Sequence, residues 1–472
     1  MKVEQIYTSC LAEAAYYIHS NGEAAIIDPL RETAPYLERA ERDHVKIKYI
    51  FLTHFHADFV SGHVDLAKKT GAQIVFGPGA KGDFDFYNGK DNEEFPVGDG
   101  IIKLLHTPGH TLESSTYLLI DKNKKDQCIF TGDTLFIGDV GRPDLAVKQG
   151  ELTEKDLAKH LFHSLRDKIM PLPNDVIVYP NHGAGSACGK NMSKETFDTL
   201  GHQKEVNYAL RADMTEAEFV KEVLTGLSKP PQYFSKNVMM NKGVNPEFDS
   251  IISQGTEALI FDFVSKKQKE GVLILDVRSQ ADFTKEHIAG SIFIGLNGQF
   301  APWVGALIKD INQPIILICP EGKEEEAVKR LSRIGYDNAI GYLKGGVQTW
   351  KDNGGATDFI ESISPEEFEA ISEKEGGKIN VLDVRKPGEY DSEHLINATN
   401  EPLDYLNENI SNLDKDKTYY VHCAGGYRSV IFESIAKAAG IHHIIDVKEG
   451  FGGIKNKTKL DRKEFVCPST LV

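Results

Sequence analysis

Short apolar runs separated by Gly, Pro and Asp turns dominate the first half of the chain. Runs of this length with turn residues at both ends are typical of β-strands. The runs occupy residues 14–19, 24–28, 49–52, 72–76 and 101–106, and Gly98-Asp99-Gly100 marks one of the turns. The pattern predicts a strand-rich first domain over residues 1–245.

Helical signals follow near the end of this block. Ser193 is expected to cap a helix over residues 194–200, and Thr215 with Glu218 forms a capping box before an apolar run over residues 219–227. The stretch from there to residue 249 has little periodicity and is rich in Asn, Lys and Pro. We therefore expect it to be a linker.

The second half of the chain is an internal duplication in which strand-like and helix-like patterns alternate. The two copies match at residues 273–278 with 380–385, at 287–288 with 394–395, and at Cys319 with Cys423. Alternation of strands and helices predicts parallel sheets. We expect two α/β domains, over residues 250–356 and 360–472. Ser364-Pro365-Glu366-Glu367 opens the second copy with a helix-capping sequence.

Composition limits the classes of function. A chain of 472 residues has room for about three domains. A net charge of −16 argues against a nucleic-acid surface. We expect no membrane span, because no segment approaches the length and apolarity of one. The N-terminus carries Glu4 and Glu13 and has no signal-peptide pattern, so a cytoplasmic protein is expected.

The cysteines are expected to be free thiols rather than disulfides, because they include no CxxC pair and no zinc-finger spacing. They are Cys10, Cys128, Cys188, Cys319, Cys423 and Cys467.

Potential metal ligands follow the ends of four apolar runs in the first block. The segments are Thr-His-Phe-His-Ala-Asp-Phe at 53–59, Thr-Pro-Gly-His-Thr at 107–111, Phe-Thr-Gly-Asp-Thr at 130–134 and Tyr-Pro-Asn-His-Gly at 179–183. A lone His after a strand is usually a hydrogen-bonded structural residue. Four such strand ends together indicate ligands that a rigid sheet aims at one point.

On these motifs the first block resembles the metallo-β-lactamase superfamily, and within it the glyoxalase II and persulfide dioxygenase branch. The superfamily's usual motif has a His directly after the position of Asp58, where this chain has Phe59. A second metal site thereby loses a ligand. Persulfide dioxygenases bind one iron, so the resemblance implies one Fe(II) per chain held by His54, His110 and Asp133. Two His and one carboxylate form the facial triad of O2-activating iron enzymes.

The same resemblance implies supporting roles for residues around the metal. His56, Asp58 and His182 would orient ligands, water or substrate, although His56 as a fourth ligand, which would favour zinc, stays open. Arg142 either pairs with an anionic thiol substrate or lies on the surface. Cys188 either packs as a small apolar residue or relays sulfur.

The loop from Cys423 to Ser429, Cys-Ala-Gly-Gly-Tyr-Arg-Ser, resembles the active-site loop of rhodaneses. Small residues let successive N–H groups face the sulfur, and the following helix dipole and Arg428 add positive charge. Cys423 and Arg428 are therefore the expected catalytic residues, with Cys423 carrying a persulfide. In the other copy, Glu324 stands where the arginine would be, so we expect Cys319 to be no competent nucleophile and residues 250–356 to form a pseudo-rhodanese with a spacing role.

The whole chain resembles a fusion of persulfide dioxygenase and sulfurtransferase. The implied fold is a multidomain chain of α/β and α+β type: an αββα metallo-β-lactamase sandwich followed by two rhodanese-like, doubly wound α/β domains. The implied function is sulfide detoxification, in which a low-molecular-weight thiol persulfide and O2 give sulfite, and sulfite takes sulfur from Cys423 to give thiosulfate. We expect a homo-oligomer without nucleic-acid or membrane partners. The alternatives are a glyoxalase II-like thioester hydrolase and a non-catalytic sulfur carrier.

Overall fold

The computed structural model describes residues 1–147, 152–227 and 229–465, so Cys467 lies outside the described residues. The chain forms two units, Met1–Ser250 with Ser332–Gly335, and Ile251–Leu331 with Tyr336–Val472. The five described cysteines are free, as expected. Within the described ranges, no helix is both long enough and apolar enough to cross a membrane.

Two sheets form the first unit. The first has the order β1-β2-β3-β4-β5-β6 and the second β12-β11-β10-β9-β8-β7. The strands are β1 (Lys2–Thr8), β2 (Glu13–Ser20), β3 (Glu23–Ile27), β4 (Lys46–Phe51), β5 (Gln73–Phe76), β6 (Tyr87–Asn88), β7 (Glu94–Val97), β8 (Gly100–His106), β9 (Ser115–Ile120), β10 (Asp126–Gly132), β11 (Ile177–Pro180) and β12 (Asp198–Thr199). The helices are α1 (Ala34–Arg42), α2 (His63–Thr70), α3 (Glu154–Ser164), α4 (Leu200–Val206), α5 (Glu216–Leu224) and α6 (Phe234–Lys242), with short helical segments at Leu165–Ile169 and Tyr208–Leu210.

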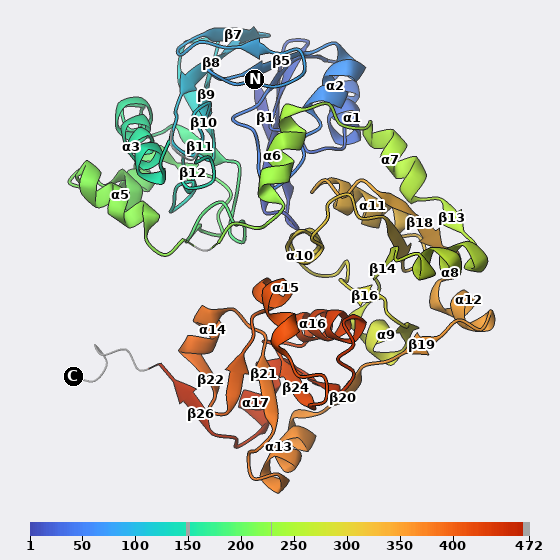
Figure 1. The fold of residues 1–472 in the computed structure, drawn as a ribbon. Coiled ribbons are helices and arrows are strands. Elements are labelled where there is room, and N and C mark those ends of the chain that lie inside the picture. Colours follow the sequence, from blue (N-terminus) through green and yellow to red (C-terminus); the bar gives the residue numbers. More distant parts are fainter. Residues whose placement is uncertain (148–151, 228, 466–472) are drawn as a thin grey trace, which may run out of the picture. The chain divides into compact units, whose positions relative to one another are not determined.

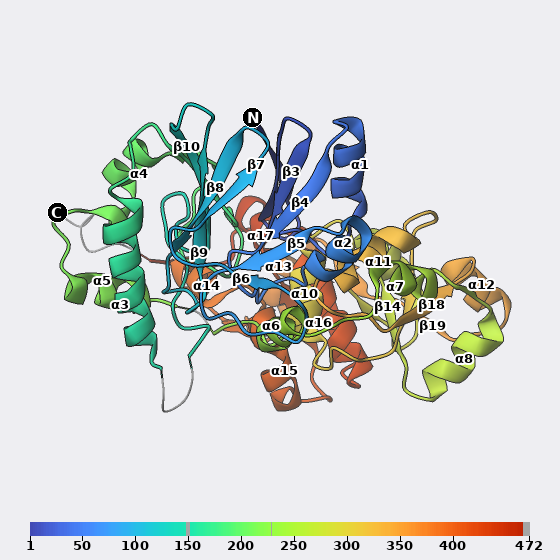
Figure 2. The same cartoon turned by 90° about the horizontal axis from the view of Figure 1, so that it is seen from above.

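The sheets pack face to face, and helices cover their outer faces (Figure 2). Tyr16, Phe51, Tyr117 and Phe130 belong to the apolar cluster between the sheets. Side chains on the outer face of the first sheet pack with α1 and α2, and those of the second pack with α3 and α5. Apolar residues on both faces of a strand require cover on both sides. The αββα sandwich expected from the sequence is confirmed.

One helix near the end of this unit differs from the sequence prediction. The helix expected over residues 194–200 does not form, and α4 begins only at Leu200. Ser193 instead pairs its backbone N–H with the Ile137 carbonyl at 2.9 Å, and Thr199 caps α4. Tertiary pairing of the backbone therefore overrides the local capping signal. The capping box of Thr215 and Glu218 is confirmed at the start of α5, which ends at Leu224.

The expected linker is wrong, because residues 234–242 form α6. Asn241 is buried, and its side-chain amide donates to the carbonyls of His56 (2.8 Å) and Phe59 (2.7 Å). Its amide oxygen accepts from the Ser61 N–H at 2.8 Å. A polar residue on the buried side hides the apolar periodicity that identifies helices in sequences. α6 thus fixes the loop that carries His54 and His56.

Replacing Asn241 with Ala is expected to destabilise the first unit by about 3 kcal/mol, because three buried backbone groups lose their partners. The midpoint of urea unfolding, followed by tyrosine fluorescence, measures this loss. Asn245→Ala is the matched control, since among the described residues the Asn245 side chain donates to the Met240 carbonyl of its own segment, at 2.9 Å. Equal midpoints for the two variants would contradict the role of α6.

His63 makes the stability of this unit sensitive to acid. Its ring is buried beside Phe84, at 4.8 Å between centroids, and neither nitrogen has a hydrogen-bond partner among the described residues. Burial, followed by the nearby His56, lowers the pKa of His63 to about 3. The unfolded chain takes up this proton near pH 6.5. The contribution of the neutral His63 ring to the free energy of unfolding is complete above pH 6.5 and is lost as the pH falls towards 3.

Between pH 7 and pH 5, His63 is expected to account for about 2 kcal/mol of lost stability. Urea unfolding at both pH values, compared with His63→Phe, measures that share, because Phe retains an aromatic ring without a titrating group. We expect a smaller loss in the variant. An identical pH dependence in the two proteins would show that His63 does not titrate in this way.

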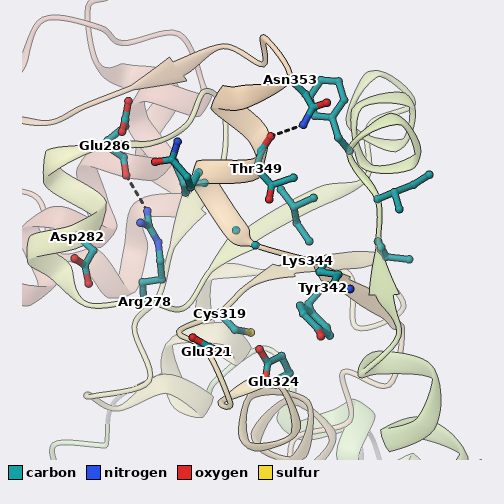
Figure 3. A pocket seen from close by; sticks show the side chains of 18 of the residues that line it. Arg278, Asp282, Glu286, Cys319, Glu321, Glu324, Tyr342, Lys344, Thr349 and Asn353 are labelled. Carbon is teal, nitrogen blue, oxygen red and sulfur yellow. Dashed lines mark hydrogen bonds between the residues drawn. The ribbon is translucent and has the colours of Figure 1, made fainter.

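The first domain of the second unit contains a parallel sheet of order β13-β18-β17-β14-β16. Its strands are β13 (Ala258–Leu259), β14 (Leu273–Asp276), β15 (His287–Ile288), β16 (Ile292–Phe293), β17 (Ile315–Ile318), β18 (Ala339–Leu343) and β19 (Thr357–Asp358). Its helices are α8 (Phe261–Lys269), α9 (Gln280–Lys285), α10 (Phe300–Leu307), α11 (Glu324–Ser332) and α12 (Gly346–Asp352), and α7 (Phe248–Gly255) precedes them. A cavity of about 1040 Å³ opens beside Cys319, Glu321 and Glu324 (Figure 3).

The second domain repeats this plan with a parallel sheet of order β20-β25-β24-β21-β23. Its strands are β20 (Glu361–Ile363), β21 (Asn380–Asp383), β22 (Glu393–Leu395), β23 (Ala398–Asn400), β24 (Tyr419–His422), β25 (Ile444–Val447) and β26 (Arg462–Glu464). Its helices are α13 (Pro365–Lys374), α14 (Pro387–Ser392), α15 (Leu406–Asn409), α16 (Tyr427–Ala438) and α17 (Gly450–Lys457), with short turns at Leu403–Tyr405 and Ile410–Asn412 (Figure 1). The capping box of Ser364 and Glu367 is confirmed. Both domains have the expected doubly wound α/β form.

Candidate metal centre and cysteine loops

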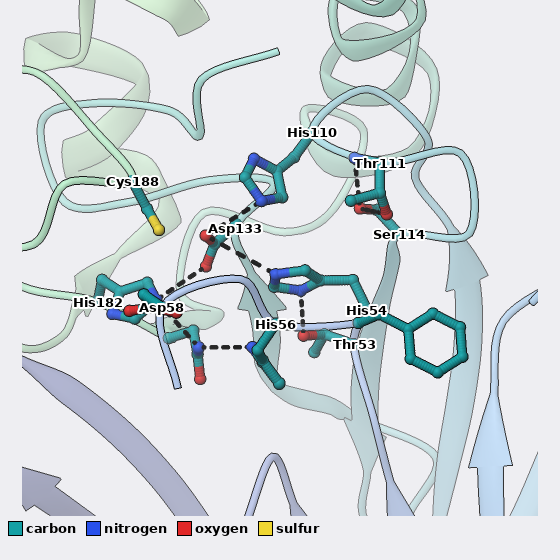
Figure 4. Close-up of polar contacts among 12 residues, drawn as sticks. Thr53, His54, His56, Asp58, His110, Thr111, Ser114, Asp133, His182 and Cys188 are labelled. Atoms are coloured by element: carbon teal, nitrogen blue, oxygen red, sulfur yellow. Dashed lines mark hydrogen bonds and ion pairs between the residues drawn. The ribbon is translucent and has the colours of Figure 1, made fainter. Parts of the chain in front are cut away.

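Three potential ligands meet at the strand ends of the first unit. One ligand atom each from His54, His110 and Asp133 lies within 4.8 Å of the other two, and all three residues are buried. His110 Nε2 is 3.4 Å and His54 Nε2 is 3.9 Å from Asp133 Oδ2 (Figure 4). His54 follows β4, His110 follows β8, and Asp133 directly follows β10. Strands of both sheets therefore aim these side chains at one point.

Hydrogen bonds fix how the two histidines present their rings. His110 Nδ1 donates to the Arg142 carbonyl at 2.9 Å, which leaves the lone pair of Nε2 towards Asp133. The Thr53 hydroxyl donates to Asp28 at 2.8 Å, so its oxygen accepts from His54 Nδ1 at 3.0 Å. With each Nδ1 held as the donor, the neutral form of each ring directs its Nε2 lone pair inwards, as metal ligation requires.

Asp133 completes a set that fits a cation. Neither carboxylate oxygen has a hydrogen-bond partner among the described residues, although both are buried. A buried carboxylate without donors is costly unless a cation or a proton balances it. Gly132 places it there with φ of +52°, and a Cβ at this glycine would lie 2.5 Å from the Thr53 hydroxyl. Two imidazole lone pairs and one open carboxylate suit a divalent transition metal.

The protonation state of His54 supports ligation. Burial, followed by the neighbouring His56, His110 and His182, lowers the pKa of His54 well below its ordinary value. The ring is therefore neutral at neutral pH and competes for metal without first losing a proton.

Asp58, His182 and Cys188 form a second cluster next to the first, with one ligand atom from each within 4.8 Å of the others. His182 Nε2 is 3.3 Å from Asp58 Oδ2 and 3.6 Å from Asp133 Oδ1. Burial, and then Asp58 and Asp133, raise the pKa of the Cys188 thiol well above its ordinary value. A neutral thiol is a poor nucleophile. The structure places the Cys188 sulfur beside potential ligands, and its role as a packed residue or a sulfur relay stays a prediction.

Both nitrogens of His56 are engaged outside the first cluster. Nε2 lies 3.0 Å from Asp28 Oδ1, and the Asn181 amide lies 3.4 Å from Nδ1. In this arrangement His56 offers no lone pair to a metal held by His54 and His110. Phe59 stacks on the His56 ring at 4.3 Å between centroids and keeps it in place.

Arg142 is not a surface residue, so that alternative is wrong. It is buried, and its guanidinium forms a two-pronged ion pair with Asp144 at 2.7 Å for both bonds. An anionic substrate would have to compete with this carboxylate for the charge. The contribution of Arg142 to the metal cluster is its backbone carbonyl, which orients His110.

Cys423 lies in a loop that directs donors at its sulfur. The Gly426 N–H donates to Cys423 Sγ at 3.0 Å, and Gly426 has φ of +103°, which an L-residue rarely adopts. α16 begins at the next residue and adds its N-terminal dipole. The guanidinium of Arg428 makes two hydrogen bonds with Glu389, at 2.6 and 2.8 Å, so its charge is partly balanced.

The corresponding loop at Cys319 has the opposite electrostatics. Burial, followed by Glu324 and Asp276, raises the pKa of the Cys319 thiol. Glu321 and Glu324 lie beside the sulfur (Figure 3). Negative charge at this position disfavours a thiolate and repels anionic sulfur donors, as we expected from the sequence.

Family models match both halves of the chain. Residues 9–182 match the metallo-beta-lactamase superfamily, and residues 262–353 and 364–457 match the rhodanese-like domain. The probable hydroxyacylglutathione hydrolase glo2 of Schizosaccharomyces pombe is 31% identical over 198 residues, which are 41% of this chain and 72% of that protein. The chain belongs to the metallo-beta-lactamase superfamily. It continues with two rhodanese-like domains.

Two further relatives of this metallo-beta-lactamase-superfamily chain bear on its chemistry. The human mitochondrial persulfide dioxygenase ETHE1 is 33% identical over 224 residues, which are 46% of this chain and 78% of the human protein. A crystal structure described as a metallo-beta-lactamase from Staphylococcus aureus superposes with a TM-score of 0.63 at 31% identity. It covers 73% of this chain and 98% of its own. The family therefore includes both hydrolases and a dioxygenase.

Two residues that organise the candidate sites of this metallo-beta-lactamase-superfamily chain, Asp28 and Glu389, were not predicted from the sequence. Asp28 follows β3 and accepts bonds from the Thr53 N–H at 2.8 Å, the Thr53 hydroxyl and His56. The same strand-end rule that identified His54 would have found it. Glu389, the partner of Arg428 in the last rhodanese-like domain, left no local signal, because it lies far from Arg428 in sequence.

Proposed function

We propose that the metallo-beta-lactamase domain is an iron-dependent persulfide dioxygenase and that the last rhodanese-like domain is a thiosulfate sulfurtransferase. The observation that carries this proposal is the cluster of His54, His110 and Asp133, in a chain that also holds Cys423 in an anion-stabilising loop. Two imidazoles and one carboxylate with open positions are the ligand set of O2-activating iron enzymes. The similarity to a persulfide dioxygenase supports the same assignment.

His54, His110 and Asp133 would hold one Fe(II) per chain, and the iron would supply the binding and activation of O2. The chain's own residues set the geometry. Thr53 and the Arg142 carbonyl keep both Nε2 atoms facing Asp133. Phe59 occupies the position where the superfamily's usual motif has another ligand, which favours one metal over two. His56, Asp58 and His182 would orient ligands and substrate around it.

The proposed substrates are those of a dioxygenase domain and a sulfurtransferase domain that act in sequence. A low-molecular-weight thiol persulfide and O2 would give sulfite and the thiol in the first domain. Cys423, loaded as a persulfide, would pass its outer sulfur to sulfite and give thiosulfate. Both intermediates are reactive, so joining the two activities in one chain limits their escape. We also propose that the protein acts in the cytoplasm as a homo-oligomer.

Product analysis tests the proposal. With glutathione persulfide in air, the protein is expected to form sulfite, and with further persulfide to form thiosulfate. Under nitrogen, sulfite formation is expected to stop. Sulfite formation that continues at the same rate without O2 would overturn the dioxygenase assignment.

A second candidate is hydrolysis of a thioester such as S-lactoylglutathione. The cluster of Asp58, His182 and Cys188 favours it, because it offers ligands for a second metal beside Asp133. Two metals would activate water for attack on a thioester. The similarity to hydroxyacylglutathione hydrolases is of the same order as that to the dioxygenase. Turnover of S-lactoylglutathione under nitrogen, with two zinc ions per chain, would favour this function.

A further inference from the structure

A large cavity lies in the first rhodanese-like domain, at the edge of its sheet where the parallel strands end. Arg278 follows β14, Cys319 follows β17 and Lys344 follows β18, and all three residues line the cavity (Figure 3). Ligands of open α/β sheets bind in the crevice at this edge. The cavity has a volume of about 1040 Å³, compared with about 260 Å³ for the cavity at Cys423. The domain whose cysteine faces carboxylates therefore holds the larger space for a ligand.

The loop at Cys319 has exchanged an anion-binding donor for a carboxylate. In the last domain, the Gly426 N–H donates to Cys423 Sγ at 3.0 Å. The N–H of Gly322, which also stands three positions after its cysteine, donates instead to Glu324 Oε1 at 3.3 Å. An anionic ligand at this cavity would therefore meet a negative charge where the last domain offers a donor.

Negative charge exceeds positive charge around the cavity. Two of its charged residues have ion-pair partners outside it, since Arg278 pairs with Asp276 at 2.7 Å and Glu286 with Lys351 at 2.8 Å. Among the described residues, no ion pair involves the other charged groups of the lining. Four carboxylates and two ammonium groups thus leave an excess of two negative charges, which favours a cation. These residues are Asp262, Asp282, Glu321, Glu324, Lys285 and Lys344.

An apolar wall completes the cavity and reaches the surface. Leu343 lines it at the end of β18, and Val347 lines it from α12. Ile260 lines it just before α8 and is 66% exposed, and Phe263 on that helix is 39% exposed. Exposed apolar side chains beside a cavity are typical of protein contacts. The volume is also at the upper end of the range for small-molecule sites, about 300–1,000 Å³. These two features favour a peptide segment over a small free cation.

We propose that this cavity binds a basic segment of a partner protein. A Lys or Arg side chain of the segment meets the carboxylates of Asp282, Glu321 and Glu324, while an apolar neighbour packs against Ile260 and the adjoining wall. The binding requires no reaction at Cys319. It is independent of the proposed dioxygenase and sulfurtransferase activities, and it gives the first rhodanese-like domain a role beyond spacing.

Fluorescence anisotropy of a labelled peptide tests the proposal on the full chain. The probe is a capped peptide of sequence Ala-Leu-Arg-Leu-Lys-Ala with a neutral fluorophore, and the comparison probe has Glu at both basic positions. We expect saturable binding of the basic probe and at least about tenfold weaker binding of the acidic probe, because like charges repel. Binding of the basic probe should weaken as the NaCl concentration rises from about 50 to about 500 mM.

Glu321→Gln combined with Glu324→Gln is expected to weaken binding of the basic probe about tenfold. Gln keeps an oxygen that can accept from the Gly322 N–H, so the loop should retain its fold. Glu325→Gln combined with Glu373→Gln is the matched control. It makes the same change in net charge with two exposed residues that do not line the cavity.

Ile260→Ser tests the apolar contact. Ile260 is the residue that precedes the first turn of α8, where Ser is a favourable capping residue, so the helix should persist. We expect the basic probe to bind about threefold more weakly to this variant, because part of its apolar contact is lost.

Weaker binding in both cavity variants, with unchanged binding in the control, would support the inference. If the basic probe does not bind, or binds no better than the acidic probe, the inference is wrong. If the Glu321 and Glu324 double variant behaves like its control, the cavity is not the site. If spermidine displaces the probe at concentrations below the probe's own Kd, the occupant is a small polycation rather than a protein segment.

Discussion

Cys423→Ser is expected to lower sulfur transfer from thiosulfate to cyanide by at least about 10³-fold, whereas Cys319→Ser leaves it within about threefold. The two cysteines occupy matching loops, yet their surroundings differ. Cys423 Sγ accepts from the Gly426 N–H at 3.0 Å at the start of α16. Cys319 has Glu321 and Glu324 beside it, and its thiol pKa is raised by burial and by Glu324.

The matched pair makes the experiment discriminating, because both variants replace one sulfur with one oxygen at equivalent points of two similar domains. Mass spectrometry after thiosulfate treatment provides a second readout, with one added sulfur expected on Cys423 and none on Cys319. Loss of activity in Cys319→Ser, or a persulfide found on Cys319, would reverse the assignment of the active domain.

His110→Ala is expected to remove bound metal and to lower persulfide-dependent O2 uptake by more than about 100-fold. Two ligands, His54 and Asp133, do not complete a facial triad. The Arg142 carbonyl, which now accepts from His110 Nδ1 at 2.9 Å, also loses its partner. Metal content per chain and O2 consumption with glutathione persulfide measure the two effects together.

His106→Ala is the matched control for this variant. His106 ends β8, four positions before His110, and its Nε2 lies 2.9 Å from the Leu112 carbonyl rather than in the cluster. We expect this variant to keep its metal and its O2 uptake. Normal metal content and activity in His110→Ala would show that the cluster is not the catalytic site.

The architecture and the convergence of the metal cluster could be predicted because they depend on local rules. A strand that ends in a sheet fixes where the next residues lie, so the motifs after β4, β8 and β10 were expected to converge, and they do so at strand ends of the two packed sheets. The duplicated Asp-Val-Arg and cysteine patterns also lie at strand ends, and their repetition identified the two rhodanese-like domains. Each metal motif and each copy of the repeat could be identified from a short stretch of consecutive residues.

Features that depend on distant contacts could not be predicted. α6 was assigned to a linker, because its buried Asn241 bonds backbone groups near residue 60 instead of showing apolar periodicity. The ion pair between Arg428 and Glu389, which partly neutralises the guanidinium, joins α16 to α14. Trp303 contributes to the cavity at Cys423 from another domain. Such pairings arise from tertiary packing, which a single sequence does not display.

Metal analysis combined with O2 consumption on one protein preparation tests the central claim most directly. Glutathione persulfide is added to aerobically purified protein whose metals have been quantified. The proposed function predicts about one iron per chain and O2 uptake that begins on addition of the persulfide and stops when iron is removed by a chelator. Two zinc ions per chain, with hydrolysis of S-lactoylglutathione and no O2 uptake, would contradict it.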